Sequence, residues 1–280
     1  MVRGPIVKPP ADQELSAGTA ATGNLKLSVT RHQCSATRFD FGCCGIGLFV
    51  RRTAIGLTIL RVSERVFQDR REAGQILGEM VAALPDLGDG VVLGLVRGGV
   101  PVAFEVAKAC GLPLDILVVR KLGVPGQEEL AMGAVASGGG VVLNEHVLRS
   151  YRISERKLEH VIEREIEELE RREKLYRDGR PALEITERAA ILVDDGLATG
   201  ASMRAGIRAV KGRARRVVVA VPVGAKSICE QLRQESDEVI CALMPEPLDA
   251  VSLFYREFRA TSDEEVRALL KQGLGLGVRD

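Results

Sequence analysis

The chain has 280 residues, of which 46% are hydrophobic and 28% charged, a composition that excludes wholesale disorder. Its net charge of +1 argues against a protein that mainly coats nucleic acid or an anionic membrane. The six cysteines lack the spacing of zinc ligands, so we expect reduced thiols and a cytoplasmic protein.

Residues 1–63 show no sustained hydrophobic period, which predicts a poorly ordered N-terminal extension with a short strand or helix at 55–62. The extension is basic and poor in acidic residues, so organelle targeting stays open beside a dispensable leader. The apolar run 41–60 is interrupted by Arg51 and Arg52, so we expect no membrane span there.

Residues 64–280 are predicted to form one α/β domain in which short apolar strands alternate with helices. Strands are expected at 91–96, 114–119, 189–193, 217–221 and 238–243, with a hairpin at 132–143. Helices are expected up to 84 and at 103–110, 154–176, 202–211 and 225–233. Almost wholly apolar strands indicate a parallel sheet covered by helices on both faces, with the ligand site beyond the carboxyl ends of the strands.

The most specific motif is the run from Ile191 to Ser202, in which a buried-type strand leads to Asp194 and Asp195 and then to a loop of small residues. The loop and the helix after it offer backbone N–H groups and hydroxyls that suit a phosphate monoester. Two adjacent carboxylates can accept hydrogen bonds from vicinal hydroxyls or hold a hydrated divalent cation. The alternative is an Asp-Asp turn that caps a helix, which the length of the run disfavours.

This run resembles the signature of the type I phosphoribosyltransferase family, and the resemblance extends over about residues 67–270. It implies a parallel sheet flanked by helices, with a small hood, a flexible lid loop, and binding of phosphoribosyl pyrophosphate (PRPP) with Mg²⁺. Asp194 and Asp195 would hold the ribose hydroxyls and, through water, the metal. The 5′-phosphate would lie against Ala198, Thr199, Gly200, Ala201 and Ser202.

A second segment, Arg97-Gly98-Gly99, follows the strand at 91–96. The glycines allow close backbone approach to an anion and Arg97 adds positive charge, although an ordinary turn would have the same composition. Its position resembles the pyrophosphate loop of the family, which often contains a cis peptide, here between Val96 and Arg97.

A third segment begins with Arg120 and Lys121 at the end of the strand 114–119. A polar loop rich in Gly and Pro follows, and we predict a lid over residues 121–131. By the resemblance both basic residues would contact the pyrophosphate; a plain surface loop is the alternative.

The segment 244–260 is the candidate hood over the acceptor, since three of the few aromatic residues, Phe254, Tyr255 and Phe258, fall within it. Tyr255 is the candidate to stack on a planar base, although at least two of the three rings are expected to pack on the core.

The resemblance implies a phosphoribosyltransferase of nucleotide or nucleoside metabolism, which transfers the 5-phosphoribosyl group to a nitrogenous base and releases pyrophosphate. Ala198 stands where enzymes for 6-oxopurines commonly carry an acidic residue, which puts those acceptors in doubt. The alternatives are a PRPP-binding regulator without transferase activity and a generic phosphate-binding domain, for which no G-x-x-x-x-G-K-[ST] loop is present. Expected partners are PRPP and a small-molecule acceptor, with a homodimer as a candidate assembly and neither nucleic acid nor membrane.

Overall fold

The computed structural model describes residues 48–53, 56–61 and 66–277. Within the predicted extension it describes one antiparallel hairpin, β1 (Leu48–Thr53) and β2 (Gly56–Arg61), and β2 falls on the segment where a short strand or helix is expected. The rest of the predicted extension lies outside the described residues.

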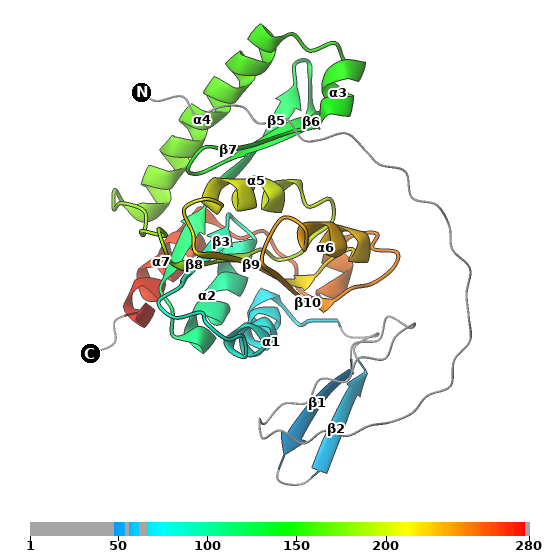
Figure 1. Cartoon of the computed structure of the whole chain (residues 1–280), viewed down its shortest axis with the longest axis vertical. Helices are drawn as coiled ribbons and strands as arrows, with labels where there is room; N and C mark the ends of the chain where they lie inside the picture. The colour runs from blue at the N-terminus through cyan, green and yellow to red at the C-terminus, as the bar shows by residue number, and fades with distance from the viewer. Residues whose placement is uncertain (1–47, 54–55, 62–65, 278–280) are drawn as a thin grey trace. The chain divides into compact units, whose positions relative to one another are not determined.

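Five parallel strands form the central sheet, in the order β10-β9-β8-β3-β4 (Figure 1). Their bounds are β3 Val91–Leu95, β4 Leu114–Leu117, β8 Ala189–Val193, β9 Arg216–Val223 and β10 Glu238–Leu243. The predicted parallel α/β fold is therefore confirmed. The chain order reverses between β3 and β8, and in sheets of this kind ligands bind outside the carboxyl ends of the two strands at such a point.

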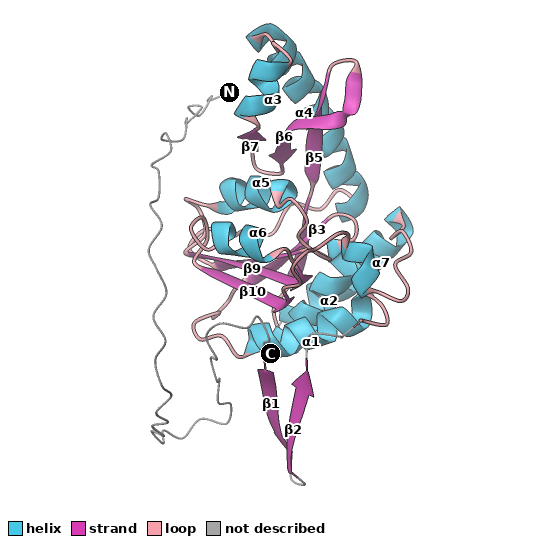
Figure 2. Ribbon diagram, turned by 90° about the vertical axis from the view of Figure 1, so that its right-hand side faces the viewer, coloured by secondary structure: helices cyan, strands magenta, loops and turns pink. Residues whose placement is uncertain are grey.

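Successive residues of each strand point to opposite faces of the sheet, and each face has its own helices. One face packs against α1 (Arg70–Ala82), α2 (Gly99–Cys110) and α7 (Asp263–Gly273). The other packs against α5 (Ala201–Val210) and α6 (Lys226–Leu232), as Figure 2 shows. Residues that alternate along β8 divide between the two cores, with Ile191 on the first and Leu192 on the second.

A second, antiparallel sheet of β5 (Val119–Val124), β6 (Gln127–Ala136) and β7 (Gly140–Leu143) is inserted between β4 and β8. The strand predicted over 114–119 is divided, because 114–117 pair with β3 whereas Val119 pairs with Ala136. The segment 121–131, predicted as a lid loop, lies in the β5–β6 hairpin. Short helix α3 (Glu145–Ser150), which the sequence does not predict, follows β7.

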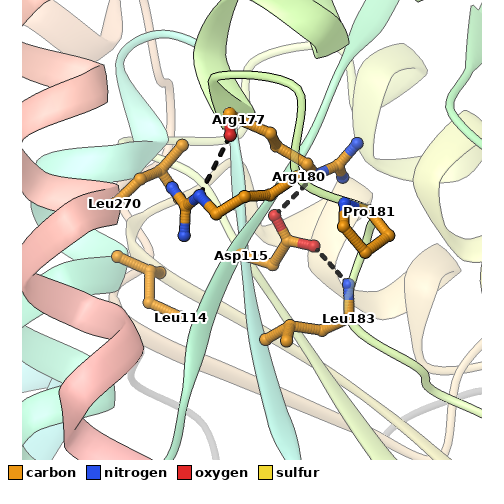
Figure 3. Close-up of a pocket in the computed structure, with 7 residues that line it drawn as sticks. All are labelled: Leu114, Asp115, Arg177, Arg180, Pro181, Leu183 and Leu270. Atoms are coloured by element: carbon orange, nitrogen blue, oxygen red, sulfur yellow. Dashed lines mark hydrogen bonds and ion pairs between the residues drawn. The ribbon is translucent and has the colours of Figure 1, made fainter.

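The long helix α4 (Glu155–Arg177) packs against β5 and β6 and is tied to the central sheet at its C-terminal end. Arg177 Nε donates to Asp115 Oδ1 over 2.9 Å, and Asp115 Oδ2 accepts from the Leu183 N–H (Figure 3). Both charged side chains are buried, and a cavity of only about 10 Å³ lies beside them. This cavity is too small for more than one water molecule, so it is a packing void and cannot hold a substrate.

The C-terminal segment contains a short 3-10 helix, Val251–Phe254, then α7, then a final 3-10 turn, Leu274–Gly277. The sequence does not predict α7, although Asp263, Glu264 and Glu265 give it an acidic first turn. Within the described part of the chain, no helix is both long and apolar enough to cross a membrane.

Candidate active site

Asp194 and Asp195 directly follow β8, the central strand, at the predicted carboxyl-terminal edge of the sheet. The Asp195 N–H donates to Asp194 Oδ1 over 2.9 Å, so the two residues fix each other's geometry. Burial, and next the negative charge of Asp195, raise the pKa of Asp194 well above its usual range, against the opposing effects of the Asp195 N–H and of Arg70. The site therefore disfavours a second negative charge on the pair, and a ligand with hydroxyl or cationic groups would stabilise that charge.

The predicted pyrophosphate loop lies directly against this pair. A Cβ atom at Gly98 would overlap Asp195 Oδ2, and one at Gly99 would lie 2.6 Å from the Val193 carbonyl oxygen. Only glycine allows this approach, so the two loops, about a hundred residues apart in the chain, form one site. The Val96–Arg97 peptide is cis, as the resemblance implies.

Arg97 is the first residue of this loop, and its side chain is about half exposed. Its Nη1 is 3.6 Å from Asp263 Oδ1 at the start of α7, and the Tyr176 hydroxyl donates to the same oxygen over 2.8 Å. The exposed guanidinium is therefore oriented by α7 and remains reachable by an anion.

The predicted phosphate loop connects β8 to α5 with its backbone held at both ends. Leu197 N–H donates to the Val223 carbonyl over 2.9 Å, and Gly200 takes a left-handed conformation with φ of 72°. No side chain caps α5, so its first N–H groups are available for an anion. Ala198 and Thr199 are exposed, while Ala201 and Ser202 are half-buried.

Arg120 and Lys121, by contrast, lie on β5 of the second, antiparallel sheet. As neighbours on β5 they point to opposite faces. Arg120 donates to Glu165 of α4 over 2.9 Å and 2.6 Å, and Lys121 is exposed. None of the contacts found in the described chain joins either residue to the Asp pair. Their contact with pyrophosphate stays a prediction.

Tyr255 is buried in the core and contacts the backbone of the Asp pair. Its side chain is 5% exposed, and its hydroxyl donates to the Asp195 carbonyl over 2.6 Å. The ring lies between Phe67 and Phe258, at centroid distances of 5.5 Å and 4.9 Å, and burial raises the pKa of its hydroxyl. The ring has no open face for a base, so the stacking role predicted for Tyr255 is not seen and the residue supports the site.

Sequence reasoning missed two arginines that contact the site. Arg70 at the start of α1 donates from Nε to Asp195 Oδ2 over 2.8 Å. Arg204 of α5 donates from Nε to Glu235 over 2.8 Å and from Nη1 to the Thr199 carbonyl over 3.4 Å. It thereby links the predicted phosphate loop to the segment that contains Glu235. Neither lies in a recognisable motif, so only the fold identifies them.

A magnesium ion implied by the resemblance can be tested against these side chains. Carboxylate oxygens suit Mg²⁺, but one oxygen of Asp195 is already bound by Arg70, and the described residues hold no cluster of three potential ligands. The pair therefore fits a hydrated ion that takes most of its ligands from water and from the oxygens of a phosphorylated substrate.

Comparison with known proteins shows the family to which this chain belongs. Residues 67–243 match the model of the phosphoribosyl transferase domain, and the chain belongs to this family. A protein of Mycobacterium tuberculosis strain CDC 1551, whose name marks it provisionally as a phosphoribosyl transferase, is 45% identical over 207 residues, which cover 74% of this chain and 46% of that protein. A protein of strain H37Rv with a similar provisional name matches equally. The chain thus spans about half the length of these relatives.

Among solved structures, the protein TT1426 of Thermus thermophilus is 43% identical, with a TM-score of 0.64. The match covers 75% of this chain and the whole of that one. The family match ends at the last residue of β10, so the segment that carries Tyr255 and α7 lies outside it.

Proposed function

We propose that this chain transfers the 5-phosphoribosyl group of PRPP to the nitrogen of a base or related acceptor, with release of pyrophosphate. The observation that carries the proposal is the direct contact between the Gly98–Gly99 loop and the Asp pair, at the carboxyl ends of β3 and β8. A pyrophosphate loop and a ribose site must adjoin in this way to hold one molecule of PRPP. The family membership supports the same reaction.

Each residue has a role in the proposed reaction. Asp194 and Asp195 accept hydrogen bonds from the ribose hydroxyls, and the 198–202 loop with the start of α5 binds the 5′-phosphate. Arg97 and the backbone at Gly98 and Gly99 bind the pyrophosphate. The anomeric C–O bond breaks with both electrons leaving on pyrophosphate, a C–N bond forms, and the acceptor nitrogen passes its proton to water. Bound Mg²⁺ would neutralise charge on the pyrophosphate.

The first test is binding of the donor. PRPP with MgCl₂ should raise the melting temperature of the protein, and the double variant Asp194→Asn with Asp195→Asn should lose this shift because both hydroxyl-binding carboxylates are gone. Differential scanning fluorimetry over a PRPP titration measures it. A wild-type melting temperature that is indifferent to PRPP contradicts the proposal.

The second test concerns the acceptor. The protein is incubated with PRPP, MgCl₂ and a panel of adenine-type, 6-oxopurine and pyrimidine bases, and release of pyrophosphate is followed. Ala198 offers no acidic group, so we expect 6-oxopurines to be poor acceptors. PRPP binding without release for any acceptor would favour the PRPP-binding regulator.

We also propose the cytoplasm as the compartment of this protein. The thiols of Cys110, Cys229 and Cys241 are free in the described part of the chain, as expected for a reducing compartment.

A further inference from the structure

Arg70 lies outside every segment that the proposed reaction uses, yet it makes the principal side-chain contact to Asp195. Its Nε donates to Asp195 Oδ2 over 2.8 Å, and its Nη2 lies 2.7 Å from the same oxygen. The two side chains are only 11% and 17% exposed, so solvent screens this ion pair little.

Arg70 is itself held on two further sides. Its Nη1 donates to the Arg259 carbonyl over 2.7 Å, and its guanidinium lies 3.9 Å from the centre of the Phe258 ring. The latter geometry is a cation–π contact, which is strengthened where water is excluded. The guanidinium therefore has a single orientation, and that orientation faces Asp195.

A short backbone pairing brings these partners together. Phe67 N–H donates to the Phe254 carbonyl, and Arg256 N–H donates back to the Phe67 carbonyl, both over 2.8 Å. Asp69 then caps α1 by accepting from the Glu72 N–H, so Arg70 begins the helix. Segments 66–70 and 254–259 thus form one clamp, whose second half lies beyond the residues that match the family model.

We propose that Arg70 is a positioning residue for the donor site, and that the clamp holds Asp195 with Oδ2 occupied and Oδ1 free for a ribose hydroxyl. This inference rests on the proposed function. Arg70 holds the side-chain carboxylate of Asp195. Tyr255 holds the backbone of the same residue, because its hydroxyl donates to the Asp195 carbonyl over 2.6 Å. Fixing Asp195 before the donor arrives lowers the entropy lost on binding.

Arg71 provides a matched control on the same helix. Its Nε lies 3.2 Å from Glu105 Oε1, and Glu105 is buried, so Arg71→Met leaves a buried carboxylate without this partner just as Arg70→Met does. Both variants are expected to lose stability, but only Arg70→Met disturbs Asp195. A loss of stability alone therefore cannot reproduce the expected result.

The experiment measures the Kd of PRPP in MgCl₂ by calorimetry, for the full chain, at a temperature where each variant is folded. Arg70→Met should weaken binding by about ten- to a hundredfold, since a displaced carboxylate costs a factor of this size. Arg71→Met should stay within about twofold of wild type. Arg70→Lys, which keeps the charge but not the fork of donors, should be intermediate.

Binding of inorganic pyrophosphate serves as the second readout, because it has no ribose hydroxyls. Arg70 Nη2 lies beside Gly98, so Arg70→Met should weaken pyrophosphate binding, but much less than PRPP binding. Equal PRPP affinity in Arg70→Met and wild type overturns the inference, as does a parallel loss of PRPP and pyrophosphate. If Arg70→Met does not fold, the PRPP affinity of Arg70→Lys is the test. An affinity equal to that of the wild type in this variant overturns the inference. A wild-type protein that does not bind PRPP would instead contradict the proposed function itself.

Discussion

Asp194 destabilises the fold at neutral pH because burial, and next the negative charge of Asp195, disfavour its ionised form. Its pKa is raised in the folded protein, so the folded state holds the proton more tightly than the unfolded chain. Below the unfolded pKa of about 4, Asp194 is protonated in both states and does not lower the free energy of unfolding. As pH rises from the unfolded pKa toward the folded pKa, the unfolded state becomes increasingly favoured, and above the folded pKa the loss is constant. The carboxylate that the proposed reaction needs therefore weakens the folded protein.

We accordingly expect Asp194→Asn to raise the melting temperature by a few degrees at pH 8, and to give a gain that disappears toward pH 4. The amide oxygen can still accept from the Asp195 N–H, and the charges that face this group, Asp195 and Arg70, are unchanged. Thermal unfolding from pH 4 to pH 8 measures the difference. Asp89→Asn, at a side chain 73% exposed, should change little at any pH. A melting temperature lowered at pH 8 would contradict the expectation.

At the scale of elements, the attachment of α4 to the central sheet depends on the buried pair Arg177 and Asp115. Arg177 also donates to the Ile116 carbonyl over 3.0 Å and to Glu173 over 2.7 Å, so each charge is well satisfied. Removing one member leaves the other charged and buried, which is strongly unfavourable.

Arg177→Met should therefore lower the free energy of unfolding by about 3–5 kcal/mol. Urea denaturation at pH 7 measures this loss. The comparison is Arg267→Met, which breaks the exposed pair with Asp178 close to the same end of α4 and should cost less than about 1 kcal/mol. Similar losses in the two variants would show that burial does not decide the strength of the pair.

The β5–β6 hairpin shows how an element can differ from its sequence pattern. Gly123, Pro125 and Gly126 indicate a loop, but Leu122 and Val124 alternate with more exposed neighbours and are buried toward the core shared with α4. That burial favours strand pairing, and Gly126, with φ of 81°, forms the tight turn. Closure of this segment over PRPP stays a prediction.

At the scale of the whole molecule, the clamp and the catalytic loops belong to residues 66–277, and the family match also begins at residue 67. We therefore expect a protein of residues 64–280 to fold and to keep the PRPP-dependent rise in melting temperature. Scanning fluorimetry of this truncation beside the full chain measures it. Loss of the shift in a folded truncation would show that residues 1–63 contribute to the donor site.

The sequence by itself determined the strand–helix alternation, the parallel sheet, and the two loops at the carboxyl ends of β3 and β8. These follow from local patterns, since an apolar strand followed by glycines or paired carboxylates has few alternative structures. Tertiary structure alone decided that Arg70 and Tyr255 support Asp195, that Arg120 pairs with Glu165, and that a second sheet follows β4. The physical reason is that the side-chain contacts join residues 45 to 125 positions apart, and no local pattern specifies which charges or rings will meet.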